Sequence, residues 1–160
     1  MPYNQNGSPA VRSATPADLP AFKAIIAAAE LFPPSFLDDM IAPYFAAAEE
    51  GIWFTLEDEE PLGMAYCVPE RMTSGTWNLL LIAVAPDRQR SGGGRLLLRA
   101  TERHAAAKGG ATLLVETSDL PDFSGPRDFY LAQGFVEEAR IRDFYQPGEA
   151  KVVFWKSLTR

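Results

Sequence analysis

Three consecutive glycines, Gly92 to Gly94, separate a strand-like run from a helix-like run and constrain the backbone more than any other feature of this sequence. Residues 76–84 read T-W-N-L-L-L-I-A-V, which is almost wholly apolar, as expected of a strand that is buried on both faces. Residues 95–108 have helical periodicity, and Gly109-Gly110 can end the helix. Because glycine has no Cβ, the turn between strand and helix can fold tightly and a ligand can approach its amides closely.

The start of this helix suits a phosphorylated ligand. The first N–H groups of a helix have no partner within it, and its N-terminal end carries a partial positive charge, so the two together favour a phosphate or a pyrophosphate. Arg88, Arg90 and Arg95 add positive side chains around the same turn. The sequence therefore predicts that a phosphorylated cofactor binds here.

The remaining elements alternate between strands and helices. A helix capped by Thr15 or Asp18 should end before Pro33-Pro34, and Ser35 with Asp38 resembles a capping box for a second helix that Pro43 should end or kink near Ala42. The other predicted elements are strands at 10–14, 52–56, 62–68 and 112–116, a short helix containing 128–133, and a closing hairpin of 136–144 with 151–155. The helix at 95–108 permits a parallel pairing of the strands on either side of it. The predicted fold class is α/β (α+β), with a single mixed sheet flanked by helices.

Composition narrows the class of protein. The 160 residues fit a single domain over residues 10–160, preceded by a loose tail at residues 1–9. A net charge of −6 argues against nucleic acid as the main partner, and no apolar run approaches the length of a membrane span. Cys67 and His104 are the only residues of their types, so no disulfide within the chain, no zinc cluster and no nucleophilic triad can form. We therefore expect a cytoplasmic protein that uses no metal.

Two common phosphate-binding motifs fit the glycines poorly. The G-x-x-x-x-G-K-[ST] string of nucleoside-triphosphate loops is absent. The dinucleotide fingerprint G-x-G-x-x-G is matched at Gly92 and Gly94 only, since Leu97 occupies the third position, although Glu116 lies near the distance expected for a ribose ligand. Residues 86–91 also intervene between the strand and the turn, where this fingerprint requires a direct connection.

The Q/R-x-x-G-x-G/A signature of the GNAT superfamily of acyl-coenzyme A N-acyltransferases is matched in full by Gln89-x-x-Gly92-x-Gly94. Val84-Ala-Pro86 resembles the V-x-P exit from the fourth strand of that family. Residues 129–135, F-Y-L-A-Q-G-F, resemble its F-Y-x-x-x-G-F helix and turn. The resemblance spans about residues 10–158. It implies a mostly antiparallel sheet with a splayed, parallel central pair of strands.

The resemblance also implies a cofactor, acetyl-coenzyme A, used as a co-substrate. Its pyrophosphate would lie on the turn and the helix start, and its pantetheine arm would run along the backbone near Ile82 and Val84. The residues expected at the turn are Gln89, Arg90, Ser91, Gly92, Gly93, Gly94 and Arg95. Tyr130 occupies the family position of a hydroxyl that faces the coenzyme sulfur, where a phenol could protonate the leaving thiolate or hydrogen-bond the developing charge; the alternative is a buried structural aromatic. Relatives often carry a glutamate base where this chain has Asn78, and Glu116 is the substitute that we expect, acting directly or through water. The alternatives are that Glu116 is a structural carboxylate at a strand end and that the amine loses its proton to solvent.

The activity that the resemblance implies is N-acetyl transfer to a primary amine by direct attack, without a covalent enzyme intermediate. The acceptor would be a small-molecule or peptide amine, recognised by residues 30–39 and 70–74, and the chain could act alone or as a homodimer. Neither nucleic acid nor a membrane is expected as a partner. The alternative is a non-catalytic sensor or subunit that binds acyl-coenzyme A without turnover.

Overall fold

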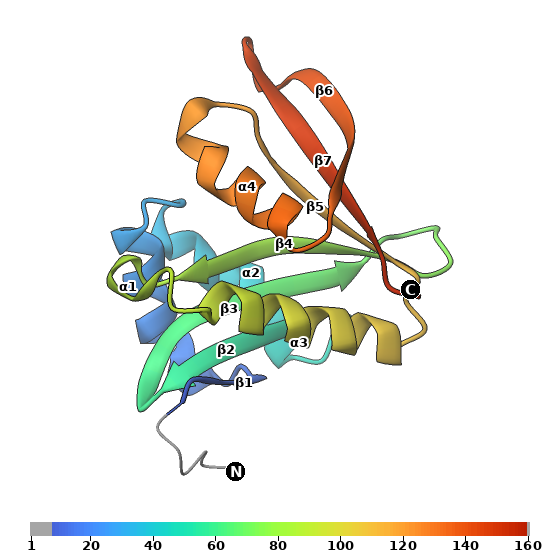
Figure 1. Cartoon of the computed structure of the whole chain (residues 1–160). Helices are drawn as coiled ribbons and strands as arrows, with labels where there is room; N and C mark the ends of the chain where they lie inside the picture. Colours follow the sequence, from blue (N-terminus) through green and yellow to red (C-terminus); the bar gives the residue numbers. More distant parts are fainter. Residues whose placement is uncertain (1–7, 160) are drawn as a thin grey trace. The chain divides into compact units, whose positions relative to one another are not determined.

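A computed structural model describes residues 8–159. These residues divide into two compact units, one formed by the chain up to Val68 with Leu81–Arg103, and the other by Pro69–Leu80 with the chain from His104 onward. The seven strands form a sheet in the order β1-β2-β3-β4-β5-β7-β6 (Figure 1). Of the predicted tail at residues 1–9, residues 1–7 lie outside the described part of the chain. The single domain over residues 10–160 stays a prediction.

The first unit contains the N-terminal antiparallel strands and two helices. Strand β1 (Ala10–Ser13) pairs with β2 (Ile52–Asp58), and β2 pairs with β3 (Glu60–Pro69). Helices α1 (Leu19–Ala28) and α2 (Leu37–Phe45) bury an apolar stripe that includes Phe22, Ile26 and Ile41. These side chains join Trp53 and Tyr66, whose rings stack at 4.3 Å between centroids. Burying this apolar surface is the main stabilisation of the unit.

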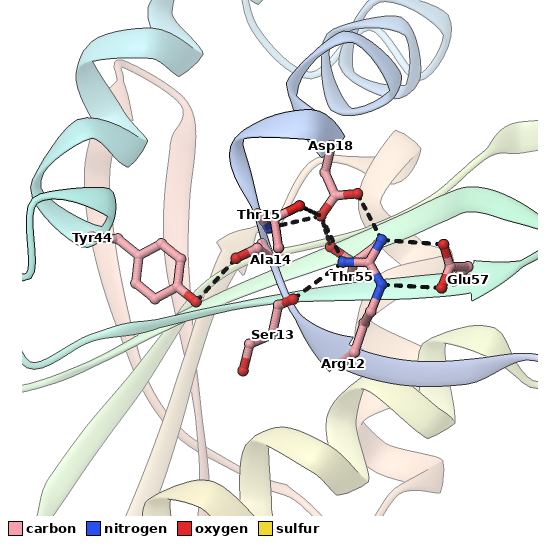
Figure 2. A network of polar contacts seen from close by, with 8 residues as sticks. All are labelled: Arg12, Ser13, Ala14, Thr15, Asp18, Tyr44, Thr55 and Glu57. Atoms are coloured by element: carbon pink, nitrogen blue, oxygen red, sulfur yellow. Dashed lines mark hydrogen bonds and ion pairs between the residues drawn. The ribbon is translucent and has the colours of Figure 1, made fainter. Parts of the chain in front are cut away.

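A polar network fixes the start of α1 on the sheet. Arg12 of β1 donates hydrogen bonds to Asp18 and Glu57, and Thr55 of β2 also donates to Asp18 (Figure 2). Asp18 is only 2% exposed. Burial opposes its ionisation, but the hydrogen bonds from Arg12, Thr15 and Thr55 outweigh burial and lower its pKa. The network therefore depends on a charged Asp18.

The second unit contains the parallel pair of strands and the C-terminal hairpin. Residues Thr76–Leu79 of β4 (Thr76–Val84) pair in parallel with Thr112–Val115 of β5 (Thr112–Ser118). Strand β5 pairs antiparallel with β7 (Glu149–Ser157), and β7 with β6 (Val136–Gln146). Helix α3 (Gly93–Ala107) ends in this unit, and α4 (Ser124–Ala132) lies wholly within it. The predicted mixed, mostly antiparallel sheet with one parallel pair is confirmed.

The second helix differs from its prediction. Ser35 does not cap it; residues 34–36 form a 3-10 turn, and α2 begins at Leu37. Pro43 lies inside α2, which continues to Phe45, because a proline near the end removes only one helical hydrogen bond. Asp38, the other half of the predicted box, forms an ion pair with Lys23 of α1 at 2.7 Å instead.

Candidate active site

The glycine turn leaves β4 through a short 3-10 turn at Pro86–Arg88 and becomes α3 at Gly93. The side chain of Gln89 donates a hydrogen bond to the carbonyl of Val84 at 3.1 Å, and the hydroxyl of Ser91 donates to the carbonyl of Arg88 at 2.7 Å. Each bond links a residue of the turn to the backbone a few residues before it. The first residue of the signature therefore anchors the turn to the end of β4 by a side-chain bond.

At two of the three glycine positions the structure gives a separate reason why glycine is present. Gly92 has a φ of +88°, which side-chain-bearing residues rarely adopt, and a Cβ there would meet nothing within 4 Å. A Cβ on Gly93 would lie 2.6 Å from Cδ2 of Leu56, which is fully buried. Gly93 is thus required by the close approach of α3 to β2. These requirements hold with or without a ligand.

The amides at the start of α3 are available to a ligand. The Leu96 N–H donates to the carbonyl of Gly92 at 3.1 Å, whereas the N–H groups of Gly93, Gly94 and Arg95 find no acceptor within residues 8–159. Residues 89–92 and Arg95 are exposed, Gly94 is half-buried and Gly93 is buried. Such a group of unpaired donors at a positive helix end fits a phosphate group. Arg88, by contrast, is engaged in an ion pair with Asp58 at 3.0 Å.

The parallel ladder between β4 and β5 is short. Its last pair is Leu79 with Val115, although β4 continues to Val84 and β5 to Ser118. Leu80, just beyond the last pair, is 51% exposed within the strand. The backbone of β4 from Leu80 onward, which includes the predicted residues Ile82 and Val84, therefore has no hydrogen-bonded partner in β5.

Glu116, the predicted base, belongs to a polar cluster in the second unit. Its Oε1 accepts a hydrogen bond from Nδ2 of Asn78 at 3.3 Å, and its Oε2 lies 2.8 Å from Nζ of Lys151. The same Asn78 Nδ2 donates to Oε1 of Glu70 at 2.9 Å. The structure thus brings three carboxylate or amide side chains together with one lysine, and the lysine neutralises Glu116 rather than Glu70.

Tyr130, the predicted acid, lies in an aromatic environment. Its ring contacts Phe129, Phe135 and Phe154, with centroid distances of 5.5, 5.7 and 5.6 Å. Burial raises the pKa of its hydroxyl, which takes part in no hydrogen bond within the described part of the chain. The phenol therefore stays protonated at neutral pH, with its donor uncommitted. Within residues 8–159 no hydrogen bond joins Tyr130 to Glu116.

The lone histidine and cysteine have packing roles. His104 of α3 meets Trp77 edge-on at 5.7 Å between centroids, and burial followed by the charge of Lys108 lowers its pKa. Cys67 in β3 is buried, which raises the pKa of its thiol to about 12. A thiol with this pKa is almost entirely protonated at neutral pH and is a poor nucleophile.

Sequence reasoning did not identify Lys151, and it placed Glu70 only in a segment expected to recognise the acceptor. Lys151 meets Glu116 diagonally across the β5–β7 ladder, because Ser118 is its direct partner. That register depends on the length of the closing hairpin, which residue types alone do not give. In residues 8–159 no three His, Cys, Asp or Glu side chains form a group that could hold a metal ion, and no helix has the length and apolar character to cross a membrane.

Comparison with known proteins gives the family. The sequence model that describes the acetyltransferase (GNAT) family matches residues 20–135 of this chain, and the chain belongs to this family. A crystal structure of a Desulfovibrio desulfuricans protein assigned to the GNAT acetyltransferases is 31% identical, with a TM-score of 0.85, covering 94% of this chain and 99% of that chain. No curated protein sequence matches significantly.

Two further solved structures are similar. The ribosomal-protein-S18-alanine N-acetyltransferase from Escherichia coli is 25% identical with a TM-score of 0.73, and the similarity covers 94% of each chain. An aminoglycoside 6′-N-acetyltransferase in complex with coenzyme A is 17% identical with a TM-score of 0.78, covering 92% of this chain and 96% of that chain. At that identity the second likeness is one of fold alone.

Proposed function

We propose that the chain is an N-acetyltransferase that moves an acetyl group from acetyl-coenzyme A to a primary amine by direct attack, without a covalent enzyme intermediate. The observation that carries the proposal is the exposed turn with three unpaired amides at the start of α3, in a chain that belongs to the GNAT family. The similar aminoglycoside 6′-N-acetyltransferase was solved with coenzyme A, which supports this co-substrate.

The proposal assigns the diphosphate of the coenzyme to the amides of Gly93, Gly94 and Arg95, with the exposed side chain of Arg90 nearby. Gln89, Ser91 and Gly92 shape this turn. The unpaired part of β4 at Ile82 and Val84 would receive the amide groups of the pantetheine arm, as an added strand would. The Val84 carbonyl already accepts from Gln89, so we assign the pantetheine bond there to its second lone pair or its N–H.

In the proposed chemistry the amine nitrogen attacks the thioester carbonyl, so that a C–N bond forms and the C–S bond breaks. The leaving thiolate takes a proton, and the Tyr130 hydroxyl is the donor that the proposal assigns to it. A carboxylate of the cluster around Asn78 takes a proton from the amine. Positioning of the two reactants supplies the remaining acceleration.

The test is calorimetric titration with coenzyme A, followed by thiol release from acetyl-coenzyme A with a panel of primary amines. Cys67 adds little thiol signal because burial raises its pKa to about 12. Binding together with thiol release is the expected result. Binding without release by any amine would favour the alternative of an acyl-coenzyme A sensor, to which the replacement of the usual glutamate by Asn78 also points. Absence of coenzyme binding at millimolar concentration would contradict both the transferase and the sensor.

The proposal specifies the acceptor by its chemical class, a small-molecule or peptide amine. The E. coli relative acts on a protein alanine and the second relative on an aminoglycoside, which supports a peptide or small-molecule amine. A cytoplasmic location and a single domain over residues 10–160 belong to the same proposal, and the single cysteine of the sequence is consistent with a reducing compartment.

A further inference from the structure

Asn78 holds two carboxylates in one cluster. Its Nδ2 donates to Oε1 of Glu70, which directly follows β3, and to Oε1 of Glu116 in β5. The side chain of Asn78 therefore points into the cluster, although the residue is only 3% exposed. Its Oδ1 is buried and has no hydrogen-bond partner within the described residues.

The two carboxylates dictate the orientation of the amide. Rotating the Asn78 amide by half a turn would bring Oδ1 against both carboxylate oxygens, where two acceptors repel a third. The observed orientation satisfies both anions and leaves Oδ1 without a donor. A buried acceptor without a donor is unfavourable, so the two hydrogen bonds to the carboxylates must outweigh this cost.

The charges of the cluster do not cancel. Lys151 forms an ion pair with Glu116, and its side chain is 12% exposed, whereas Glu70 has no cation within 4 Å among residues 8–159. Glu70 is half-buried, so its carboxylate is accessible to a ligand. One negative charge therefore remains, on the carboxylate that Asn78 holds more closely. A primary ammonium group carries both N–H donors and a positive charge, so it fits this carboxylate.

We propose that Glu70 binds the ammonium of the acceptor and takes its proton, with Asn78 as the positioning residue. This inference rests on the proposed N-acetyltransferase function. One ammonium proton passes to Glu70 and then to solvent, which leaves the nitrogen with a lone pair. As the C–N bond forms the nitrogen loses a second proton, which balances the proton gained by the thiolate. Glu116, neutralised by Lys151, is not the base in this assignment.

The charges also specify the acceptor class. A carboxylate next to the amine would approach the uncompensated carboxylate of Glu70, so a free amino acid is repelled. An amine without an adjacent carboxylate, such as an alkylamine or the N-terminus of a peptide, is attracted instead. Alaninamide and alanine are a matched pair of probes, because they differ mainly in that carboxylate.

The experiment compares Glu70→Gln and Glu70→Asp with Glu116→Gln and with Glu60→Gln as the control. Glu60 is exposed at the other end of β3, so its substitution removes the same charge outside the cluster. Thiol release is measured with butylamine, alaninamide and alanine over about pH 6 to 9, together with coenzyme affinity and melting temperature. The titratable groups that face the cluster are Lys151, which is paired with Glu116, and Tyr145, whose pKa is raised by burial and then by the charge of Glu116.

For Glu70→Gln we expect a fall of at least about tenfold in kcat/KM for alaninamide. Glu70→Asp should keep part of the activity, and coenzyme affinity and melting temperature should match those of Glu60→Gln. Alanine should be a poorer acceptor than alaninamide. A kcat/KM of Glu70→Gln equal to that of the control, or a fall in kcat/KM in Glu116→Gln alone, would overturn the assignment while the transferase function stands. A wild-type protein that releases no thiol with any amine would overturn both.

Discussion

Lys151 of β7 lies 2.8 Å from Glu116 of β5 and 3.8 Å from the centre of the Phe144 ring in β6, so one ammonium group joins three strands. Replacing it by methionine keeps the length and the apolar stem but removes the charge. We expect Lys151→Met to lower the free energy of unfolding by about 1–2 kcal/mol, because a half-buried ion pair and a cation–π contact are lost together. Urea unfolding measures this, with Lys151→Arg as the control; equal losses in both variants would show that charge is not the cause.

Tyr130→Phe removes the hydroxyl and keeps the ring, so it separates the catalytic role of Tyr130 from its packing role. The hydroxyl makes no hydrogen bond within the described residues, and the ring contacts Phe129, Phe135 and Phe154 remain in the variant. We therefore expect a melting temperature close to that of the wild type, and a fall in turnover of at least about tenfold if the phenol assists the thiolate. Coenzyme affinity should change little. Unchanged turnover would assign Tyr130 to packing alone.

Gly92 can be tested with two nearly isosteric side chains. Its φ of +88° is tolerated better by asparagine and aspartate than by other side chains, and space for a Cβ is open. Gly92→Asp places a negative charge beside the unpaired amides, so we expect coenzyme affinity to fall by at least about tenfold, whereas Gly92→Asn should retain most of it. Calorimetry with coenzyme A measures both. Similar affinities in the two variants would contradict the assignment of the diphosphate to this turn.

Gly93→Ala should act on stability rather than on charge. The new Cβ would lie 2.6 Å from the buried Leu56 side chain, and overpacking of this kind costs about 1–3 kcal/mol. Gly125→Ala in α4 is the matched control, because its Cβ would meet nothing within 4 Å and alanine favours a helix by up to about 1 kcal/mol. Thermal unfolding should therefore shift in opposite directions. A stable Gly93→Ala would mean that α3 can move away from β2 at little cost.

Asp18→Asn should destabilise the first unit in a pH-dependent way. Folding lowers the pKa of Asp18, so its contribution is complete above the pKa of the unfolded chain and is lost as the pH falls through the folded pKa. We expect a loss of about 2 kcal/mol at neutral pH, because charged hydrogen bonds to Arg12 disappear, and a smaller difference from wild type in acid. Asp38→Asn, in an exposed pair with Lys23, should cost less than about 1 kcal/mol. If the stability lost in Asp18→Asn did not change with pH, the predicted role of the Asp18 charge would be contradicted.

Local signals in the sequence determined the order of the elements. The apolar run at residues 76–84 became β4 with the predicted bounds, and the parallel pairing with β5 followed from the helix between them. The glycines, the signature around Gln89 and the aromatic helix around Tyr130 likewise led to the family that the comparison confirms. These features can be predicted from neighbouring residues, because strand and helix periodicities and turn chemistry act over short stretches of chain.

Tertiary structure alone decided which side chains meet. Glu116 was predicted as the base, which stays a prediction; the register of β5 on β7 brings Lys151 to it, and the fold places Asn78 between Glu70 and Glu116. Gly93 owes its identity to Leu56, a residue far away in the sequence. Each of these relationships depends on strand register and on the approach of elements that are distant along the chain. A shift of one residue in register reverses the face of every side chain, so such contacts are fixed by the packed fold and not by local sequence.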